Sequence, residues 1–125
     1  MMEGDTALER CIRKSTIGNA IVTRSDPYQP TGCALSRSLM VAADLIEGEQ
    51  IHLLNQQTRA SVVTHVIEGD PGEVAVLGEL AGFAAVGDSL SMESYAWVSD
   101  DEWDVFQPRN LHLDTTNGVV ETPVS

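Results

Sequence analysis

The chain has 125 residues, of which 42% are hydrophobic, so it is long enough for one domain with a single core. Its 19 acidic and 7 basic residues give a formal net charge of −12, which argues against nucleic acid and anionic membranes as partners. No stretch approaches the roughly 20 apolar residues that span a bilayer, and the first residues lack a signal peptide's apolar region. We therefore expect a cytoplasmic protein.

The chain has too few cysteines and histidines to suggest a metal site or a set of structural disulfides. Cys11 and Cys33 cannot form a structural zinc site on their own, and each is either a small buried hydrophobe or a reactive thiol. His52, His65 and His112 do not have the spacing of metal ligands. We expect no metal.

Hydrophobic periodicity predicts mainly strands, joined by turns rich in glycine and proline. In chain order we expect a short helix over 1–13 with Leu8 and Ile12 on one face, a strand over 16–23, a turn region over 26–32, a helix over 38–46 capped by Ser36 or Ser38, strands over 50–55, 59–68 and 73–77, a helical turn over 80–86, a strand over 89–98 and then an irregular polar tail. Many short strands with one or two brief helices favour a mainly β fold that closes into a small barrel.

The segment over 38–51, SLMVAADLIEGEQI, closely resembles a segment of bacterial aspartate 1-decarboxylases that reads roughly LMDAADLLEGEQV. Shorter matches lie over 14–17 and 20–23 in the family's opening strand, over 64–67 in its TYAI-like strand and over 84–88 at its VGD corner. The resemblance implies a double-psi β-barrel over 14–98, with residues 1–13 as an extension. It also implies a tail over 99–125 that packs on the surface or on a neighbour, and a homotetramer with active sites between subunits.

The family makes its cofactor by cutting its own chain at a Gly-Ser bond, which converts the serine into a pyruvoyl group. The gapless alignment places Thr31 and Gly32 at this bond, and glycine has no side chain that could attack or become pyruvoyl. A shift of one residue instead aligns Gly32 and Cys33 with the bond. A thiol can also attack the preceding carbonyl, so this second alignment keeps self-cleavage as an alternative.

Other positions differ from the family's substrate-binding set. Thr16 replaces a lysine that binds the substrate carboxylate, although Lys14 lies two residues away. Ser61 replaces the substrate-binding arginine, with Arg59 close by, and Leu77 replaces an asparagine. Either cation can bind a carboxylate or phosphate, or form an ordinary surface ion pair.

Three residues are candidates for catalysis. His65 replaces the tyrosine that protonates the decarboxylated intermediate, which suggests a general acid or base, although a histidine in an apolar strand is often structural. Cys33 is either a nucleophile with His65 as its base or a buried spacer. Thr64 matches a threonine that assists the backbone rearrangement in the family, and it also has a simpler role in supporting the strand.

These departures lead us to expect a repurposed enzyme that works without a cofactor. The expected activity is hydrolysis, or lyase or cyclase chemistry, on a small or polyketide-like metabolite, with an uncleaved chain. One alternative is a pyruvoyl-dependent amino-acid decarboxylase, acting on aspartate, that processes itself at Gly32–Cys33. Another is a non-catalytic barrel that binds a metabolite or a partner protein.

Overall fold

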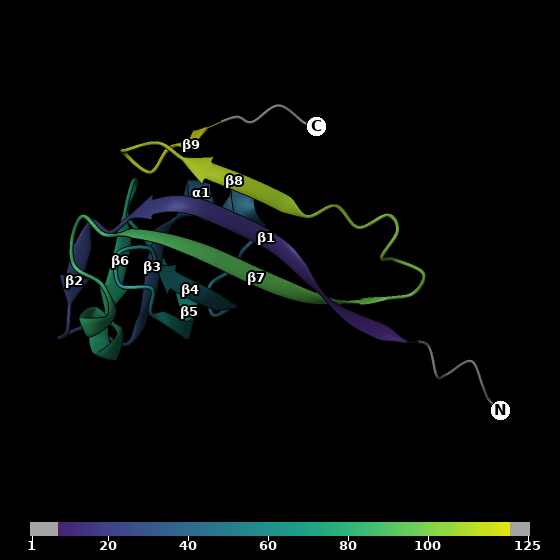
Figure 1. Cartoon of the computed structure of the whole chain (residues 1–125), viewed down its shortest axis with the longest axis horizontal. Coiled ribbons are helices and arrows are strands. Elements are labelled where there is room, and N and C mark those ends of the chain that lie inside the picture. The colour runs from purple at the N-terminus through teal and green to yellow at the C-terminus, as the bar shows by residue number, and fades with distance from the viewer. Residues whose placement is uncertain (1–7, 121–125) are drawn as a thin grey trace.

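The computed structural model describes residues 8–120, and its strands form one nine-stranded sheet in the order β2-β6-β3-β5-β4-β7-β1-β8-β9 (Figure 1). The elements are β1 (Glu9–Ile21), β2 (Arg24–Asp26), β3 (Gly32–Ser36), α1 (Arg37–Ala43), β4 (Gln50–Asn55), β5 (Ser61–Gly69), β6 (Val74–Leu77), the 3-10 helix η2 (Gly78–Phe83), β7 (Ser89–Ser99), β8 (Arg109–Leu113) and β9 (Val119–Val120). The expected mainly β fold with two short helices is confirmed. Within the described residues no helix is long and apolar enough to cross a membrane.

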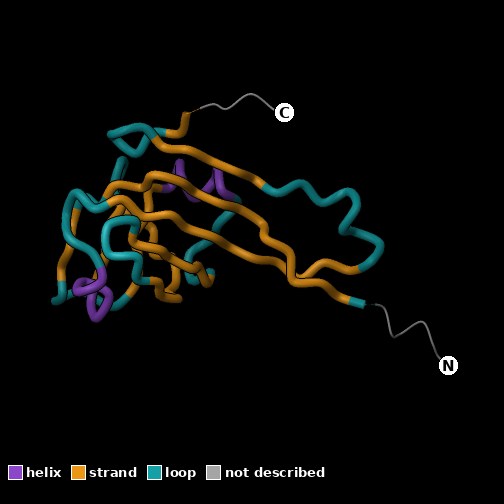
Figure 2. The backbone as a smooth tube through the Cα atoms, viewed as in Figure 1, coloured by secondary structure: helices purple, strands orange, loops and turns teal. Residues whose placement is uncertain are grey.

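The longest strands, β1 and β7, pair antiparallel and form a ribbon that, with the loop after β7, extends beyond the other strands (Figure 2). Side chains alternate along β7, so that Leu90, Met92 and Ser94 are buried while Tyr95 and Trp97 are exposed. This alternation lets one face of the ribbon cover the core. The other face stays open to solvent in the single chain.

The core is built from aliphatic side chains contributed by almost every strand and by α1. Its one fully buried large polar side chain among the described residues is Asn55. The Asn55 amide donates to the backbone oxygen of Phe83 (3.1 Å) and to Asp88 Oδ2 (3.0 Å), and its oxygen accepts from the Gln57 N–H (2.9 Å). Asn55 therefore ties the end of β4 to the turns around η2 and β7.

Strand β3 lies between β5, with which it runs parallel, and β6, with which it runs antiparallel. All five of its residues are buried, and they alternate between two surroundings. Cys33 and Leu35 belong to the main core, whereas Ala34 packs in a smaller cluster with Ala75 and Leu77. Ser36 then caps α1 by accepting a hydrogen bond from the Leu39 N–H (3.3 Å).

Some expected elements differ from the structure. Residues 9–13 belong to β1 and not to a helix, because pairing with β7 overrides the weak helical spacing of Leu8 and Ile12. The rest of the expected helix, residues 1–7, lies outside the described residues. The tail over 99–125 is not irregular throughout, since β8 pairs parallel with β1 and β9 pairs with β8. The division into a barrel over 14–98 with flanking extensions stays a prediction.

Candidate functional site

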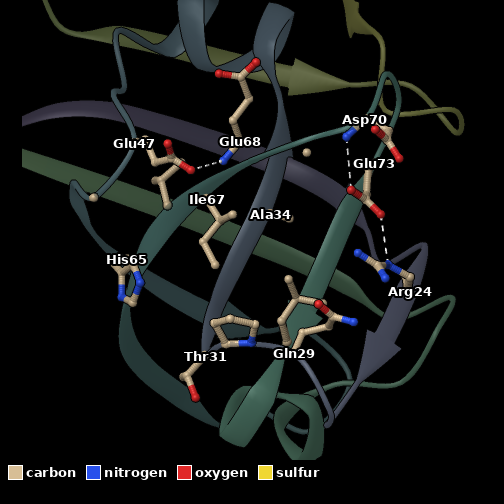
Figure 3. Close-up of a pocket in the computed structure, with 15 residues that line it drawn as sticks. Arg24, Gln29, Thr31, Ala34, Glu47, His65, Ile67, Glu68, Asp70 and Glu73 are labelled. Carbon is tan, nitrogen blue, oxygen red and sulfur yellow. Dashed lines mark hydrogen bonds and ion pairs between the residues drawn. The ribbon is translucent and has the colours of Figure 1, made fainter.

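A cavity of about 600 Å³ opens beside β3, between β5, β6 and the turn that follows β2 (Figure 3). Ala34, Ile67 and Leu77 make its wall apolar, while His65 and Thr31 border it at the start of β3. Four carboxylates and one arginine also line it: Glu47, Glu68, Asp70, Glu73 and Arg24. This volume and this mixture of surfaces are typical of a small-molecule site.

Gly32 is the first residue of β3, and the neighbouring side chains leave no space for a side chain at this position. A Cβ built on Gly32 would lie 2.5 Å from Ile67 Cδ1 and 3.2 Å from His65 Nε2. Both side chains come from the pocket-facing side of β5. Only glycine therefore fits at position 32 without displacing Ile67, and His65 Nε2 lies beside the space that a Cβ would occupy.

A Gly32→Ala substitution is expected to destabilise the protein by about 1–3 kcal/mol, because the new methyl group overpacks against Ile67. Gly82→Ala is a matched control, since a Cβ at Gly82 meets nothing within 4 Å. Urea unfolding of the two variants measures the difference. Equal midpoints for the two variants would show that Ile67 moves aside at no cost.

The structure does not bring together the expected nucleophile and base. Cys33 is fully buried in the core, opposite Val66 of β5 and Val76 of β6. This burial raises the pKa of the Cys33 thiol to about 12. His65 lines the cavity on the other face of β5, so the folded chain holds no Cys33–His65 dyad.

Of the other expected site residues, Leu77 lines the cavity, opposite Gly32 on the neighbouring strand. Thr64 is half-buried next to His65 and pairs with Ile51 of β4. Successive residues of a strand face opposite ways, so Thr64 is directed away from the cavity.

The expected polar substrate-binding residues lie elsewhere in the single chain. Thr16 Oγ1 donates to Asn110 Oδ1 (2.7 Å), and the Lys14 ammonium binds Glu49 and the backbone oxygen of Asp44. Arg59 donates to Gln56 Oε1 (3.2 Å), and Ser61 is exposed at the start of β5. None of these four lines the cavity, so any role they have in the substrate site of this chain stays a prediction.

Sequence reasoning missed the polar part of the cavity. Arg24, Thr31 and the four carboxylates lie in turns or at strand ends, where charged residues are common for other reasons. For one contact beside the cavity the sequence does contain a local indication, the glycine at position 78. Gly78 has a φ of +66° and packs against Thr31. Thr31 Oγ1 accepts a hydrogen bond from the Glu79 N–H (3.0 Å). A glycine just after a strand indicates such a close approach, but it does not identify the partner.

Comparison with known proteins identifies the family. The family model described as aspartate decarboxylase matches residues 8–120. The chain belongs to the aspartate decarboxylase family. The aspartate 1-decarboxylase of Albidiferax ferrireducens is 36% identical over 112 residues, which cover 88% of this chain and 83% of that protein. The aspartate 1-decarboxylase of Laribacter hongkongensis is 31% identical over 118 residues, 93% of each chain. The aspartate 1-decarboxylase 2 of Polaromonas sp. is 32% identical over 114 residues, 90% of each chain.

This membership confirms the resemblance and the double-psi β-barrel fold of the aspartate decarboxylase family. It also corrects two expectations. The relatives are named decarboxylases over most of the chain, so the expected cofactor-independent hydrolase acting on a polyketide-like metabolite is wrong. The family is pyruvoyl-dependent, so the expectation that the protein has no cofactor is contradicted as well. The chain is a member of an enzyme family whose members act on small molecules and are generally oligomeric.

Proposed function

We propose that this chain is a pyruvoyl-dependent amino-acid decarboxylase that processes itself at the Gly32–Cys33 bond. The observation that supports this bond most directly is the packing of Gly32, where a side chain would collide with Ile67. A self-cleaving bond of this family begins with glycine, and Gly32 meets that requirement sterically as well as chemically. The residue after it must carry a nucleophile on its Cβ, and Cys33 does. The alternative bond, Thr31–Gly32, offers no such atom.

The proposed processing uses only chain atoms and water. Cys33 Sγ attacks the Gly32 carbonyl carbon, the C–N bond breaks, and the acyl group moves from nitrogen to sulfur. Loss of the Cys33 α-proton then breaks the Cβ–S bond, which leaves a thiocarboxylate on Gly32 and a dehydroalanine at position 33. Addition of water and release of ammonia convert the dehydroalanine into the pyruvoyl group. The shorter fragment ends at Gly32, and its thiocarboxylate hydrolyses to a carboxylate with release of hydrogen sulfide.

Position 33 fits this group by its surroundings. β3 is held on both sides by β5 and β6, where Cys33 pairs with Val66 and Val76, so the new end of the chain would stay anchored next to Gly32, which adjoins His65 and Leu77. When present, a pyruvoyl group supplies a carbonyl that captures a substrate amine and accepts the electrons released when carbon dioxide leaves. His65 is the titratable side chain next to Gly32, and we assign it the proton that replaces the carboxylate.

Release of carbon dioxide from carboxyl-labelled amino acids tests the activity. Aspartate, the substrate in the relatives' names, is the first to try, followed by neutral and basic amino acids. Turnover of at least one α-amino acid by the processed protein is the expected result. A fully processed protein that releases no carbon dioxide from any of them would contradict the proposal.

Processing should be slow at neutral pH and should accelerate as pH rises. The raised pKa of Cys33, about 12, keeps the thiol protonated at pH 7, and the thiolate is the attacking form. Its population grows about tenfold per pH unit below the pKa, so we expect a roughly hundredfold faster cleavage at pH 9 than at pH 7. The fraction of cleaved chain followed over time in freshly synthesised protein measures this. A rate that does not change over this range would show that deprotonation of Cys33 does not limit processing.

The same pKa fixes the pH range over which this measurement is valid. The folded pKa of Cys33 lies above the ordinary value of 9.0, so folding favours the protonated thiol. This contribution to stability is fully present below about pH 9. It is lost above that pH, because the unfolded chain then releases the proton more readily than the folded chain. Titration of Cys33 should therefore leave the stability of the fold almost unchanged from pH 7 to 9.

We also propose that the protein assembles as a homotetramer, as family membership suggests. Tyr95 and Trp97 project from the outer face of β7, and Val63 is exposed on β5. Tyr95 and Trp97 also border a second cavity of about 420 Å³ together with His52, whose ring lies 5.0 Å from that of Tyr95. Aromatic side chains in such positions commonly pack between subunits. Light scattering that gives the mass of a monomer would contradict this assembly.

A further inference from the structure

The turn over 27–31 lies between β2 and β3 and leads directly into Gly32, so it supports the amino side of the proposed cleavage bond. Asp26 shapes the first part of this turn. Its Oδ1 accepts a hydrogen bond from the Tyr28 N–H (3.0 Å), and its Oδ2 accepts one from Gln29 Nε2 (3.4 Å). Both bonds are local, and neither ties the end of the turn to the rest of the fold.

One side-chain hydrogen bond links this turn to an element that is distant in the sequence. Thr31 Oγ1 accepts a hydrogen bond from the Glu79 N–H (3.0 Å), at the start of η2 and 48 residues later in the chain. Within residues 8–120, the other hydrogen bonds that join this turn to a side chain end at Asp26. The Thr31 hydroxyl is therefore the polar anchor of the turn.

The backbone packs closely at the same point. Gly78 is the first residue of η2 and has a φ of +66°. A Cβ on Gly78 would lie 2.6 Å from Thr31 Cα and 2.7 Å from the backbone oxygen of Gln29, so glycine lets the turn lie directly on the backbone of η2. The residue before it, Leu77, pairs with Gly32. The segment that begins at Leu77 therefore contacts both the turn and the residue whose carbonyl is attacked.

The two sides of the cleavage bond are held in different ways. On the far side of Gly32, Ile67 and His65 occupy the space that a Cβ would fill, and pairing with β5 and β6 holds the residues after the bond. The residues before the bond lie outside the sheet and are anchored at Thr31. The attack by Cys33 Sγ is intramolecular, so its rate depends on how often the backbone around the bond has the reactive geometry.

We infer that Thr31 is a positioning residue for self-cleavage. Its hydroxyl accepts the Glu79 N–H and thereby fixes the backbone that precedes the Gly32–Cys33 bond. The inference rests on the proposed processing and adds a residue to it. Thr31 takes no part in the chemistry, because the attacking atom is Cys33 Sγ, and it acts only through the backbone.

Cleavage kinetics of full-length variants test this role. Thr31→Val keeps the shape of the side chain but removes the acceptor, whereas Thr31→Ser keeps the acceptor. In freshly synthesised protein at pH 9, followed by denaturing electrophoresis, Thr31→Val should be cut about fivefold more slowly than the unmodified chain, which corresponds to one ordinary hydrogen bond. Thr31→Ser should be cut at nearly the unmodified rate. Equal rates for Thr31→Val and the unmodified chain, or an equally slow Thr31→Ser, would overturn the inference.

A Thr58→Val control separates positioning from a general loss of stability. Thr58 Oγ1 accepts a hydrogen bond from the Ala60 N–H (3.2 Å) in another exposed turn, which does not line the cavity beside Gly32. Thr31 and Thr58 are both exposed, so water can replace either acceptor and the fold should remain intact. Urea unfolding, with Cys33→Ala added to keep each chain uncut, should give similar small shifts for both variants, while only Thr31→Val slows cleavage. Equal slowing by both would also overturn the inference.

The unmodified chain distinguishes failure of this inference from failure of the proposed function. If it is cut at Gly32–Cys33 and Thr31→Val is cut equally fast, the bond is correct and the positioning role of Thr31 is wrong. If the unmodified chain is never cut, the proposed processing is wrong, and the positioning role is wrong as well.

Discussion

A Cys33→Ala chain is expected to remain uncut and to release no carbon dioxide from any amino acid. Alanine has no atom that can attack the Gly32 carbonyl, so neither cleavage nor the pyruvoyl group can follow. The fold should survive, because the substitution removes a single sulfur atom from the core and costs about 1 kcal/mol. Denaturing electrophoresis and labelled carbon dioxide release measure the two effects separately.

Two matched variants make the result specific. Cys33→Ser keeps a nucleophile at the same position and should still be cleaved, whereas Cys33→Ala should not. Cys11→Ala removes the other cysteine, which is exposed and lies outside the cavity, and should behave like the unmodified chain. Activity that persists in Cys33→Ala would place the cofactor elsewhere or show that none is needed.

A His65→Asn variant is expected to be cleaved normally but to lose about 10²–10⁴-fold in kcat, the usual contribution of a general acid or base. His65 is the titratable group next to Gly32, with Nε2 3.2 Å from the position of a Cβ there. Asparagine retains a polar side chain of similar size but cannot deliver a proton near neutral pH. Steady-state kinetics after complete processing measures the loss.

His52→Asn is the control for this prediction. His52 lies on β4 beside Tyr95 and does not line the cavity. Its substitution should leave kcat close to that of the unmodified enzyme. If His65→Asn and His52→Asn lost activity equally, or if His65→Asn failed only in cleavage, the assignment of His65 as the proton donor would be wrong.

Much of the fold was predictable because its strands follow simple local rules. The expected strand over 50–55 coincides with β4, and the helix capped at Ser36 begins at Arg37 as α1. The strands expected over 59–68, 73–77 and 89–98 agree with β5, β6 and β7 to within two residues at each end. The strand expected over 16–23 lies within β1 for most of its length, but β1 begins at Glu9. Alternating side chains and strong turn residues determine these elements, and both features are local.

Elements formed by distant pairing were not predictable in the same way. β3 is only five residues long and owes its strand conformation to β5 and β6 on its two sides. β8 follows a polar segment and runs parallel with β1, which lies more than 90 residues earlier in the chain. Residues 9–13 have only a weak helical spacing, and they form a strand because they pair with β7. In each case a partner strand decides the outcome.

The candidate site was only partly predictable for a related reason. Alignment to a family assigns positions, and two of the residues that it selected, His65 and Leu77, line the cavity. It could not show that Cys33 faces the core while its neighbours Gly32 and Ala34 adjoin the cavity, because this depends on the pleat of β3. Nor could it reveal that acidic residues from separate turns converge on one wall.

The intact mass of the purified protein under denaturing conditions tests the central claim most directly. We predict that the 13.5 kDa chain is replaced by two fragments that separate at Gly32–Cys33. The larger fragment should begin with a pyruvoyl group in place of a free amino terminus, and the smaller fragment should end in a carboxylate or thiocarboxylate. A single species at the full mass, even after incubation at pH 9, would contradict self-processing at this bond.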